Sequence, residues 1–234
     1  MHQVSHIMGK ELKDFFISPI AYIVISVFLL VTGWLFFSTF FVFNQADMRN
    51  FFNLLPMTFA FVVPAITMRL FAEELSTGSY ETLLTLPVTF RAIILGKFLA
   101  GVAMVAALLL PTLSYPIFIS FMGALDWGPV VGGYVGAVFL GAAFSAVGLF
   151  ASALTRNQII AFIIGLAICF TLTLIDKMLY FLPQSLLGVF SYLGADFHFQ
   201  NIAKGIIDSR DILYFVSICF VGLYGAYLAL LHRH

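Results

Sequence analysis

Charge is what this chain lacks most. Its 234 residues include 11 Lys and Arg and 11 Asp and Glu, so that 9% of the chain is charged. Soluble domains carry about 25% charged residues. The signs balance to a net charge of zero, which gives no indication of a nucleic-acid or acidic partner. Apolar residues take the place of charge, since 62% of residues are hydrophobic and 28 are phenylalanine. This composition excludes an ordinary soluble domain.

Cysteine is also scarce. Cys169 and Cys219 each lie in the middle of an apolar run without ligand-like neighbours. We therefore expect small packing residues there rather than a disulfide or a metal site. A cleavable signal peptide is not expected either. The first apolar run covers residues 20–43, which is longer than the apolar core of about 7–15 residues in such peptides.

The motifs of most enzymes and pumps are missing as well. Gly96 and Lys97 are followed by Phe98, and Arg91 stands where a phosphate-binding loop requires glycine. No Ser–His or Asp–Asp pair lies within an apolar run, which argues against an intramembrane protease. We also expect no ionisable group inside the membrane, where ion-coupled transporters need one. If this protein moves a substrate, its energy must come from another subunit.

What the chain does have is six long apolar segments. They cover residues 20–43, 52–71, 98–123, 130–154, 159–176 and 212–231. A helix of about 20 residues crosses the hydrocarbon core of about 30 Å. The sequence therefore predicts an all-α polytopic membrane protein with six transmembrane helices, which form one membrane domain over residues 1–234.

The distribution of Lys and Arg predicts the orientation. With the N-terminus inside, seven of the 11 basic residues are cytoplasmic: Lys10, Lys13, Arg69, Arg91, Lys97, Arg156 and Arg233. The other four, Arg49, Lys177, Lys204 and Arg210, are outside. Six crossings then return the C-terminus to the cytoplasm.

Three features flank the spans. Residues 1–19 form an amphipathic pattern, with Glu11 intruding on its apolar side, and predict an interfacial helix that ends at Ser18 and Pro19. Residues 73–78 are predicted to form a turn, followed by a small cytoplasmic coupling helix over 79–86. Residues 177–211 are predicted to form an outer re-entrant hairpin and a polar loop, because the apolar stretch 178–193 is short and broken at Pro183 and Gly188.

Small residues recur in the fourth span. Gly132, Gly136, Gly141 and Ser145 follow the spacing that lets helices approach closely in lipid. We interpret this face as a packing surface within one protomer rather than as the lining of a substrate path.

The predicted turn and coupling helix, with the residues on either side of them, show a family resemblance. The runs 68–74 (MRLFAEE), 78–84 (GSYETLL), 86–88 (LPV) and 95–98 (LGKF) resemble those of ABC type-2 permeases. The runs 197–199 (FHF), 205–211 (GIIDSRD) and 16–22 (FISPIAY) resemble the gliding-motility-type, or GldF-like, branch of that family. The resemblance covers nearly the whole chain.

The resemblance implies a transmembrane subunit of an ATP-driven exporter in the bacterial inner membrane. Two permease copies, most simply a homodimer along the first and fifth spans, would work with cytoplasmic ATPase subunits that hold ATP and Mg²⁺. This chain itself would bind no cofactor and catalyse no reaction. Members of the branch often neighbour a membrane-anchored protein with a large extracytoplasmic domain.

Two sets of residues are candidates for function. The ATPase-coupling set comprises Glu73, Glu74, Gly78, Ser79, Glu81, Thr82, Leu83, Leu84, Pro87 and Arg156. The outer-gate set comprises His198, Asp208, Arg210 and Asp211, in which Arg210 can pair with a carboxylate. A static cap on the last helix is the simpler interpretation of the second set. An ATP-independent channel or scramblase-like protein remains the alternative function, although it would need a polar stripe that these spans do not show.

Overall fold

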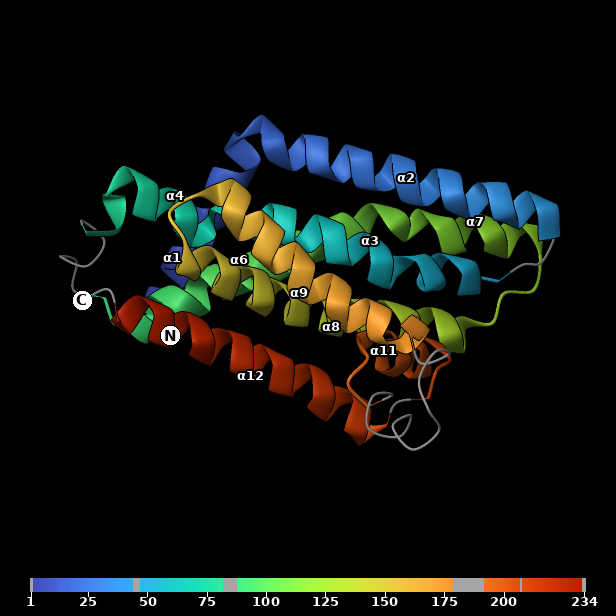
Figure 1. Ribbon diagram of the computed structural model, residues 1–234. Coiled ribbons are helices and arrows are strands. Elements are labelled where there is room, and N and C mark those ends of the chain that lie inside the picture. Colours follow the sequence, from blue (N-terminus) through green and yellow to red (C-terminus); the bar gives the residue numbers. More distant parts are fainter. Residues whose placement is uncertain (1, 44–46, 82–87, 179–191, 207, 233–234) are drawn as a thin grey trace.

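Helices make up the whole architecture of the part of the chain that the structure describes. The computed structural model describes residues 2–43, 47–81, 88–178, 192–206 and 208–232. The helices are α1 (His2–Ile17), α2 (Pro19–Phe43), α3 (Arg49–Thr67), α4 (Arg69–Thr77), α6 (Phe90–Thr112), α7 (Ser114–Met122), α8 (Trp127–Leu154), α9 (Gln158–Met178), α11 (Ala195–Ala203) and α12 (Ser209–Leu231). Figure 1 shows the long helices lying side by side along roughly one common axis.

Within the described residues, six helical stretches are long and apolar enough to cross a membrane. They are Pro19–Val42, Arg49–Thr77, Phe90–Met122, Trp127–Leu154, Gln158–Lys177 and Ser209–Leu231. The second stretch combines α3 with α4, and the third combines α6 with α7. The predicted all-α polytopic membrane protein with six spans is therefore confirmed.

The small-residue helix α8 forms the centre of the bundle. Of its most apolar stretch, 72% is buried, against 17% for the equivalent part of α12. Gly133 lies against the ring of Phe52 on α3, and Gly141 lies against Val105 on α6. No larger side chain fits at these contacts. The prediction that this face packs within one protomer is confirmed.

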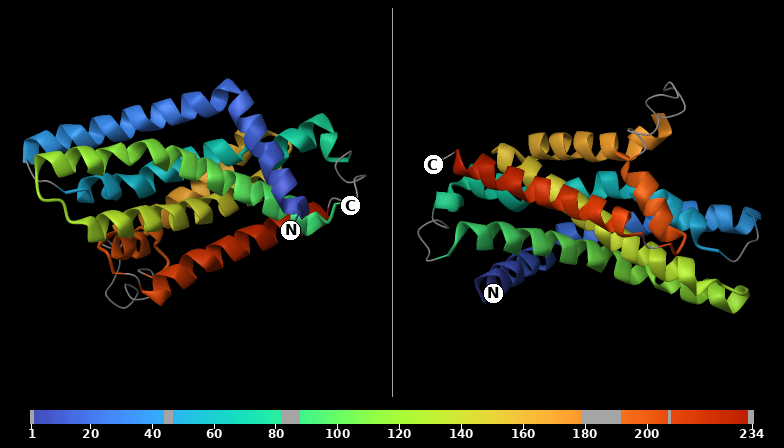
Figure 2. Two further views of the ribbon diagram at one scale, coloured as in Figure 1. Left: turned by 180° about the vertical axis from the view of Figure 1, so that it is seen from behind. Right: turned by 90° about the horizontal axis from the view of Figure 1, so that it is seen from below.

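Both chain ends lie at the same end of the bundle, which we call the terminal end (Figure 1). Helix α1 meets α2 there at a steep angle, as Figure 2 shows, and the break falls at Ser18 as predicted. The opposite end carries α11 and the start of α12 and is called the α11 end. This placement fits an even number of crossings.

One local prediction is wrong. Residues 73–77 do not form a turn, because α4 continues as a regular helix to Thr77. Gly78 then ends it in the left-handed conformation with φ 75°, which glycine adopts without steric cost. The carboxylates of Glu73 and Glu74 are compatible with this helix, because they lie at the end of the bundle, near basic partners.

Two predicted features lie wholly or largely outside the described residues. The chain is helical again at 79–81, but the rest of the small coupling helix falls in the undescribed segment 82–87. The broken hairpin falls in the undescribed segment 179–191. The loop that follows it is described, and it contains α11.

Candidate functional site

A buried lysine connects three helices at the terminal end. Lys97 on α6 donates hydrogen bonds of 2.8 Å to Glu11 Oε1 on α1, to Glu74 Oε1 on α4 and to the carbonyl oxygen of Leu70. Its side chain is 1% exposed. An ammonium has three donors, so all of them are used. We call Lys97, Glu11, Glu74 and the Leu70 carbonyl the Lys97 cluster.

The cluster corrects the expectation that the spans hold no ionisable group. Helix α6 begins at Phe90, about two turns before the apolar run that starts at Phe98, so Lys97 lies within a span. A buried ammonium is tolerated only when it is paired and hydrogen-bonded. The two carboxylates supply that pairing, and the ring of Phe71 lies 5.2 Å from the lysine nitrogen.

The cluster is acidic and borders a polar cavity. Two carboxylates face one buried ammonium, and the exposed Lys10 lies 3.9 Å from Glu74 as a second, weaker partner. Glu74 Oε2 is buried and has no hydrogen-bond partner among the described residues. The adjoining cavity of about 250 Å³ is also lined by Asp14, Arg69, Glu73, Thr77 and Ser79. The end of α4 is therefore anchored by the buried Lys97 cluster, and charged residues around the adjoining cavity remain accessible. We call these accessible residues the rim.

Several predicted coupling residues form that rim. Glu73 is about half exposed and lies 3.8 Å from Arg69, whose guanidinium stacks 4.9 Å above the ring of Phe15. The hydroxyl of the exposed Ser79 lies 2.9 Å from that of Thr77. Glu81 is exposed. Glu74 differs from the others, because it points inward to Lys97.

The remaining coupling candidates are placed elsewhere. Arg156 is exposed in the short joint between α8 and α9, at the terminal end. Thr82, Leu83, Leu84 and Pro87 lie outside the described residues. The structure therefore brings Glu73, Glu74 and Ser79 together around one cavity, and it leaves the apolar part of the predicted set undescribed.

Ser152 on α8 holds the start of α4. Its hydroxyl oxygen accepts hydrogen bonds from the backbone N–H groups of Phe71 (2.8 Å) and Ala72 (2.9 Å) and donates to the carbonyl oxygen of Met68 (2.8 Å). These N–H groups belong to the first turns of α4, so the serine fixes the start of this helix on α8. Sequence reasoning missed this residue, because a serine in a small-residue helix looks like any other packing position.

A second buried cluster lies at the α11 end. His198 Nδ1 lies 2.6 Å from Asp211 Oδ1, and both side chains are 3% exposed. Nε2 of the same ring lies 3.1 Å from the carbonyl oxygen of Tyr192. Both partners accept, so both bonds form at once only when the imidazole carries two protons or Asp211 is protonated. The ring of Tyr214 stacks on His198 with centroids 4.1 Å apart.

The four outer-gate candidates therefore separate into two pairs. His198 and Asp211 are joined in the buried cluster. Asp208 is the N-cap of α12 and accepts a 3.0 Å hydrogen bond from the backbone N–H of Arg210. The Arg210 side chain is exposed and forms no ion pair within the described ranges. Asp208 thus serves as a cap, and gating by this set stays a prediction.

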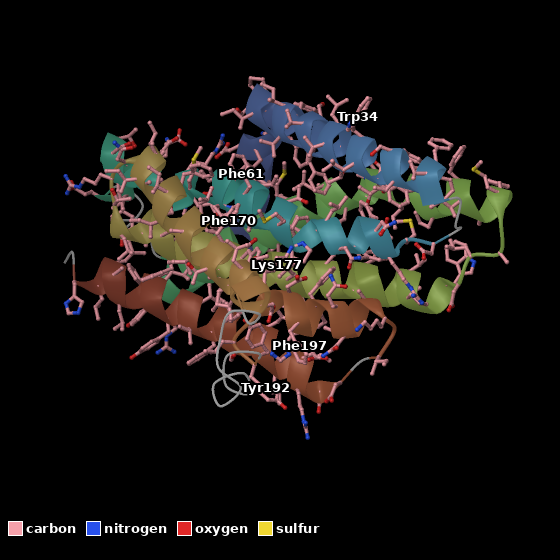
Figure 3. The ribbon with its side chains drawn as sticks, turned by 45° about the vertical axis from the view of Figure 1, so that its right-hand side comes forward. Trp34, Phe61, Phe170, Lys177, Tyr192 and Phe197 are labelled. Atoms are coloured by element: carbon pink, nitrogen blue, oxygen red, sulfur yellow. The ribbon has the colours of Figure 1, made fainter. Side chains whose placement is uncertain are left out.

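Two further residues of this region lie outside the predicted gate set and hold the loop in place. Asp176, at the end of α9, accepts a 2.8 Å hydrogen bond from the backbone N–H of Phe197, and Tyr214 donates a 2.6 Å hydrogen bond to the carbonyl oxygen of Leu193. Figure 3 shows Tyr192 and Phe197 close together beside α12. The described loop is therefore tied to both α9 and α12.

Neither cluster has the composition of a metal site. Across the described part of the chain, no group of three or more His, Cys, Asp or Glu is arranged to hold a metal ion. The first cluster is instead suited to fixing helices relative to one another. The second joins α11 to the start of α12.

Comparison with known proteins identifies the family. Residues 5–204 match the profile described as "ABC-2 family transporter protein". A search of the curated proteins found no match. The matched region includes nearly all of α1, the Lys97 cluster and α11, and it ends before α12 begins. Because it covers most of the chain and the fold has six spans, this protein is a membrane subunit of an ABC transporter and belongs to the ABC-2 family.

Proposed function

We propose that this chain is the permease of an ATP-driven exporter and that a separate cytoplasmic ATPase docks on the end of α4. The observation that carries the proposal is the Lys97 cluster. Its hydrogen bonds of 2.8 Å join α1, α4 and α6 through one buried atom. A force applied at the exposed rim therefore reaches a membrane span without passing through a flexible loop.

The rim presents exposed acidic and polar side chains to a partner. Glu73 and Glu81 are exposed acids on either side of Gly78, and Ser79 is exposed between them. Basic side chains of an ATPase would pair with these acids, and Leu83 and Leu84 would enter an apolar cleft of the partner. Arg156 would add a contact from the neighbouring joint. ATP and Mg²⁺ would be bound by the partner alone.

Movement would then pass to the centre of the bundle. When the partner displaces α4, Ser152 transmits the displacement to α8, and Lys97 transmits it to α6 and α1. Helix α8 packs against α11 through Gly132 and Gly136. The same movement would thus reach the α11 end, where the His198–Asp211 pair would act as part of an exit gate.

A second permease copy would complete the substrate path. As in α12 (17%), only a small share of the most apolar part of α2 and of α9 is buried within one protomer, 22% in each. In Figure 3, Trp34 projects from α2 away from the bundle. These two helices are the first and fifth spans, along which we propose that the copies meet. The protein would lie in the inner membrane of a bacterium, as in the GldF-like branch, with its terminal end facing the cytoplasm. An accessory extracytoplasmic protein could join the complex.

The test is purification of the tagged chain from cells that express the neighbouring genes. We expect an ATPase to copurify, ATP hydrolysis to require it, and the complex to contain two permease copies. Charge reversal by Glu73→Lys with Glu81→Lys should remove the ATPase, whereas Lys204→Glu at the α11 end should not. ATP hydrolysis by the isolated chain, or substrate flux without any nucleotide, would instead support a different class of function.

A further inference from the structure

A groove between α6 and α12 opens at the terminal end of the bundle. It is lined by Arg91 and Leu95 of α6 and by Phe220, Leu223, Tyr224 and Tyr227 of α12. Its volume is about 330 Å³, within the range of about 300–1,000 Å³ that is usual for ligand sites. Both walls belong to membrane spans. The groove therefore opens toward lipid rather than toward water.

One wall of the groove is a row of aromatic rings. Phe220 and Tyr224 stack with centroids 6.1 Å apart and planes 3° apart, and Tyr224 and Tyr227 stack at 6.5 Å. The row continues to Phe90, whose ring lies 5.6 Å from that of Tyr227. Tyr227 lies seven positions after Phe220, so the row extends about 10 Å along the helix. A flat, continuous apolar surface of this kind suits a hydrocarbon chain.

Among the described residues that line the groove, Arg91 is the one cation. Arg91 lies in the first turn of α6 and is exposed. Within the described ranges it forms no ion pair, unlike Arg69 and Lys97 at the same end. A guanidinium matches the geometry of a phosphate and binds it through two parallel hydrogen bonds. The hydroxyls of tyrosines at a membrane interface can add further polar contacts.

We propose that this groove binds one anionic phospholipid, with its phosphate on Arg91 and an acyl chain along the aromatic row. The combination of a basic mouth and an apolar floor between spans is typical of sites for anionic lipid headgroups. A free phosphate would leave the aromatic row uncovered. A helix of a second copy would have to bring an acid to Arg91 or leave that charge unpaired. The site is independent of ATPase docking, and the proposed orientation places it in the cytoplasmic leaflet.

The experiment measures which lipid occupies the groove of the full-length protein in vesicles. Trp34 and Trp127 are replaced by phenylalanine, and Leu95→Trp places the single fluorophore in the groove. Vesicles contain increasing fractions of brominated phosphatidylglycerol or brominated phosphatidylcholine, which quench tryptophan on contact. We expect the association constant to be about fivefold higher for phosphatidylglycerol than for phosphatidylcholine, because one arginine near a membrane surface contributes about 1 kcal/mol to the binding of anionic lipid.

Matched variants separate recognition from misfolding. Arg91→Gln should reduce the ratio of the two association constants to about 1, so that the preference is lost. Arg91→Lys should keep most of the preference because the charge remains. Arg156→Gln removes another exposed arginine from the terminal end and should leave the preference unchanged. Thermal unfolding of each variant shows that the fold is retained.

Three results would overturn the proposal. Equal quenching by both lipids, or a preference that survives Arg91→Gln, would remove the role of the arginine. Restoration of fluorescence by inorganic phosphate at constant ionic strength would mark a site for free anions. Absence of quenching by either lipid would mean that a second copy, or another helix, covers the groove.

Discussion

Lys97 and Glu11 are 86 positions apart in the chain, and their side chains meet at 2.8 Å inside the bundle. Glu11 lies on the otherwise apolar side of an amphipathic helix, and Lys97 lies in a membrane span. Each would be unfavourable in its place without the other. Their pairing explains how a short helix outside the spans is fixed against the bundle, and it makes α1 part of the same rigid unit as α4.

Removal of the lysine should destabilise the protein strongly. Lys97→Met leaves two carboxylates without their buried partner. Breaking a buried ion pair in this way lowers the free energy of unfolding by about 3–5 kcal/mol. Thermal or denaturant unfolding in detergent measures the loss. Lys10→Met is the control, because that side chain is 57% exposed and 3.9 Å from Glu74, and exposed pairs contribute less than about 1 kcal/mol. Similar losses in the two variants would contradict the role of the cluster.

Ser152→Ala should weaken the connection between α8 and α4. The change removes a buried hydroxyl that accepts from the N–H groups of Phe71 and Ala72, and each such hydrogen bond contributes about 0.5–1.5 kcal/mol. Hydrogen exchange of the first turn of α4 should increase by more than that of α3. Ser38→Ala is the matched control, because its exposed hydroxyl bonds only to the carbonyl of Leu35 in its own helix. Unchanged exchange in α4 would show that the serine is dispensable.

The two pairs of outer candidates should behave differently. His198→Ala leaves Asp211 buried without its 2.6 Å partner and should lower the free energy of unfolding by about 1–3 kcal/mol. Arg210→Ala should change it by less than about 0.5 kcal/mol, as for other exposed surface positions. If Arg210 is part of a gate, its variant will assemble and hydrolyse ATP normally but lose transport. Normal transport would leave only the capping role of Asp208.

Gly132 should not tolerate a side chain. A Cβ at this position would meet the carbonyl oxygen of Ile202 and lie 3.1 Å from Gly205 Cα, so Gly132→Ala must move α11 away from α8. We expect destabilisation of about 1–3 kcal/mol, the usual cost of overpacking. Gly9→Ala is the control, because nothing lies within 4 Å of its Cβ position and alanine favours the helix by about 1 kcal/mol. A stabilising effect at Gly132 would contradict the close packing of α11.

The spans were predictable from the sequence for a simple physical reason. A helix must cross a hydrocarbon layer of fixed thickness, so length and hydropathy suffice to find it. The small-residue face of α8 follows from an equally local rule. The burial of Lys97 does not follow from such rules, because a count of basic residues by side places this lysine among the cytoplasmic ones. The lysine is tolerated inside only because carboxylates from two other helices surround it.

The candidate site was only partly predictable. The intrusion of Glu11 on an apolar helix face was a visible signal of a buried partner, but its identity depends on how α1 packs against α6. Residues 73–77 were interpreted as a turn because polar residues and Gly78 follow one another there. The pairing of His198 with Asp211 depends on the path of the chain between α11 and α12. No sequence spacing fixes contacts of this kind.

The account depends most on the exposed end of α4 being the surface that an ATPase contacts. A photo-crosslinking amino acid introduced at Ser79 tests this directly in the purified complex, with the same amino acid at the exposed Ser209 of the α11 end as control. We predict a crosslink to the ATPase subunit from position 79 and none from position 209. A permease–ATPase complex that is active in ATP hydrolysis and yields no crosslink from position 79 would contradict the account.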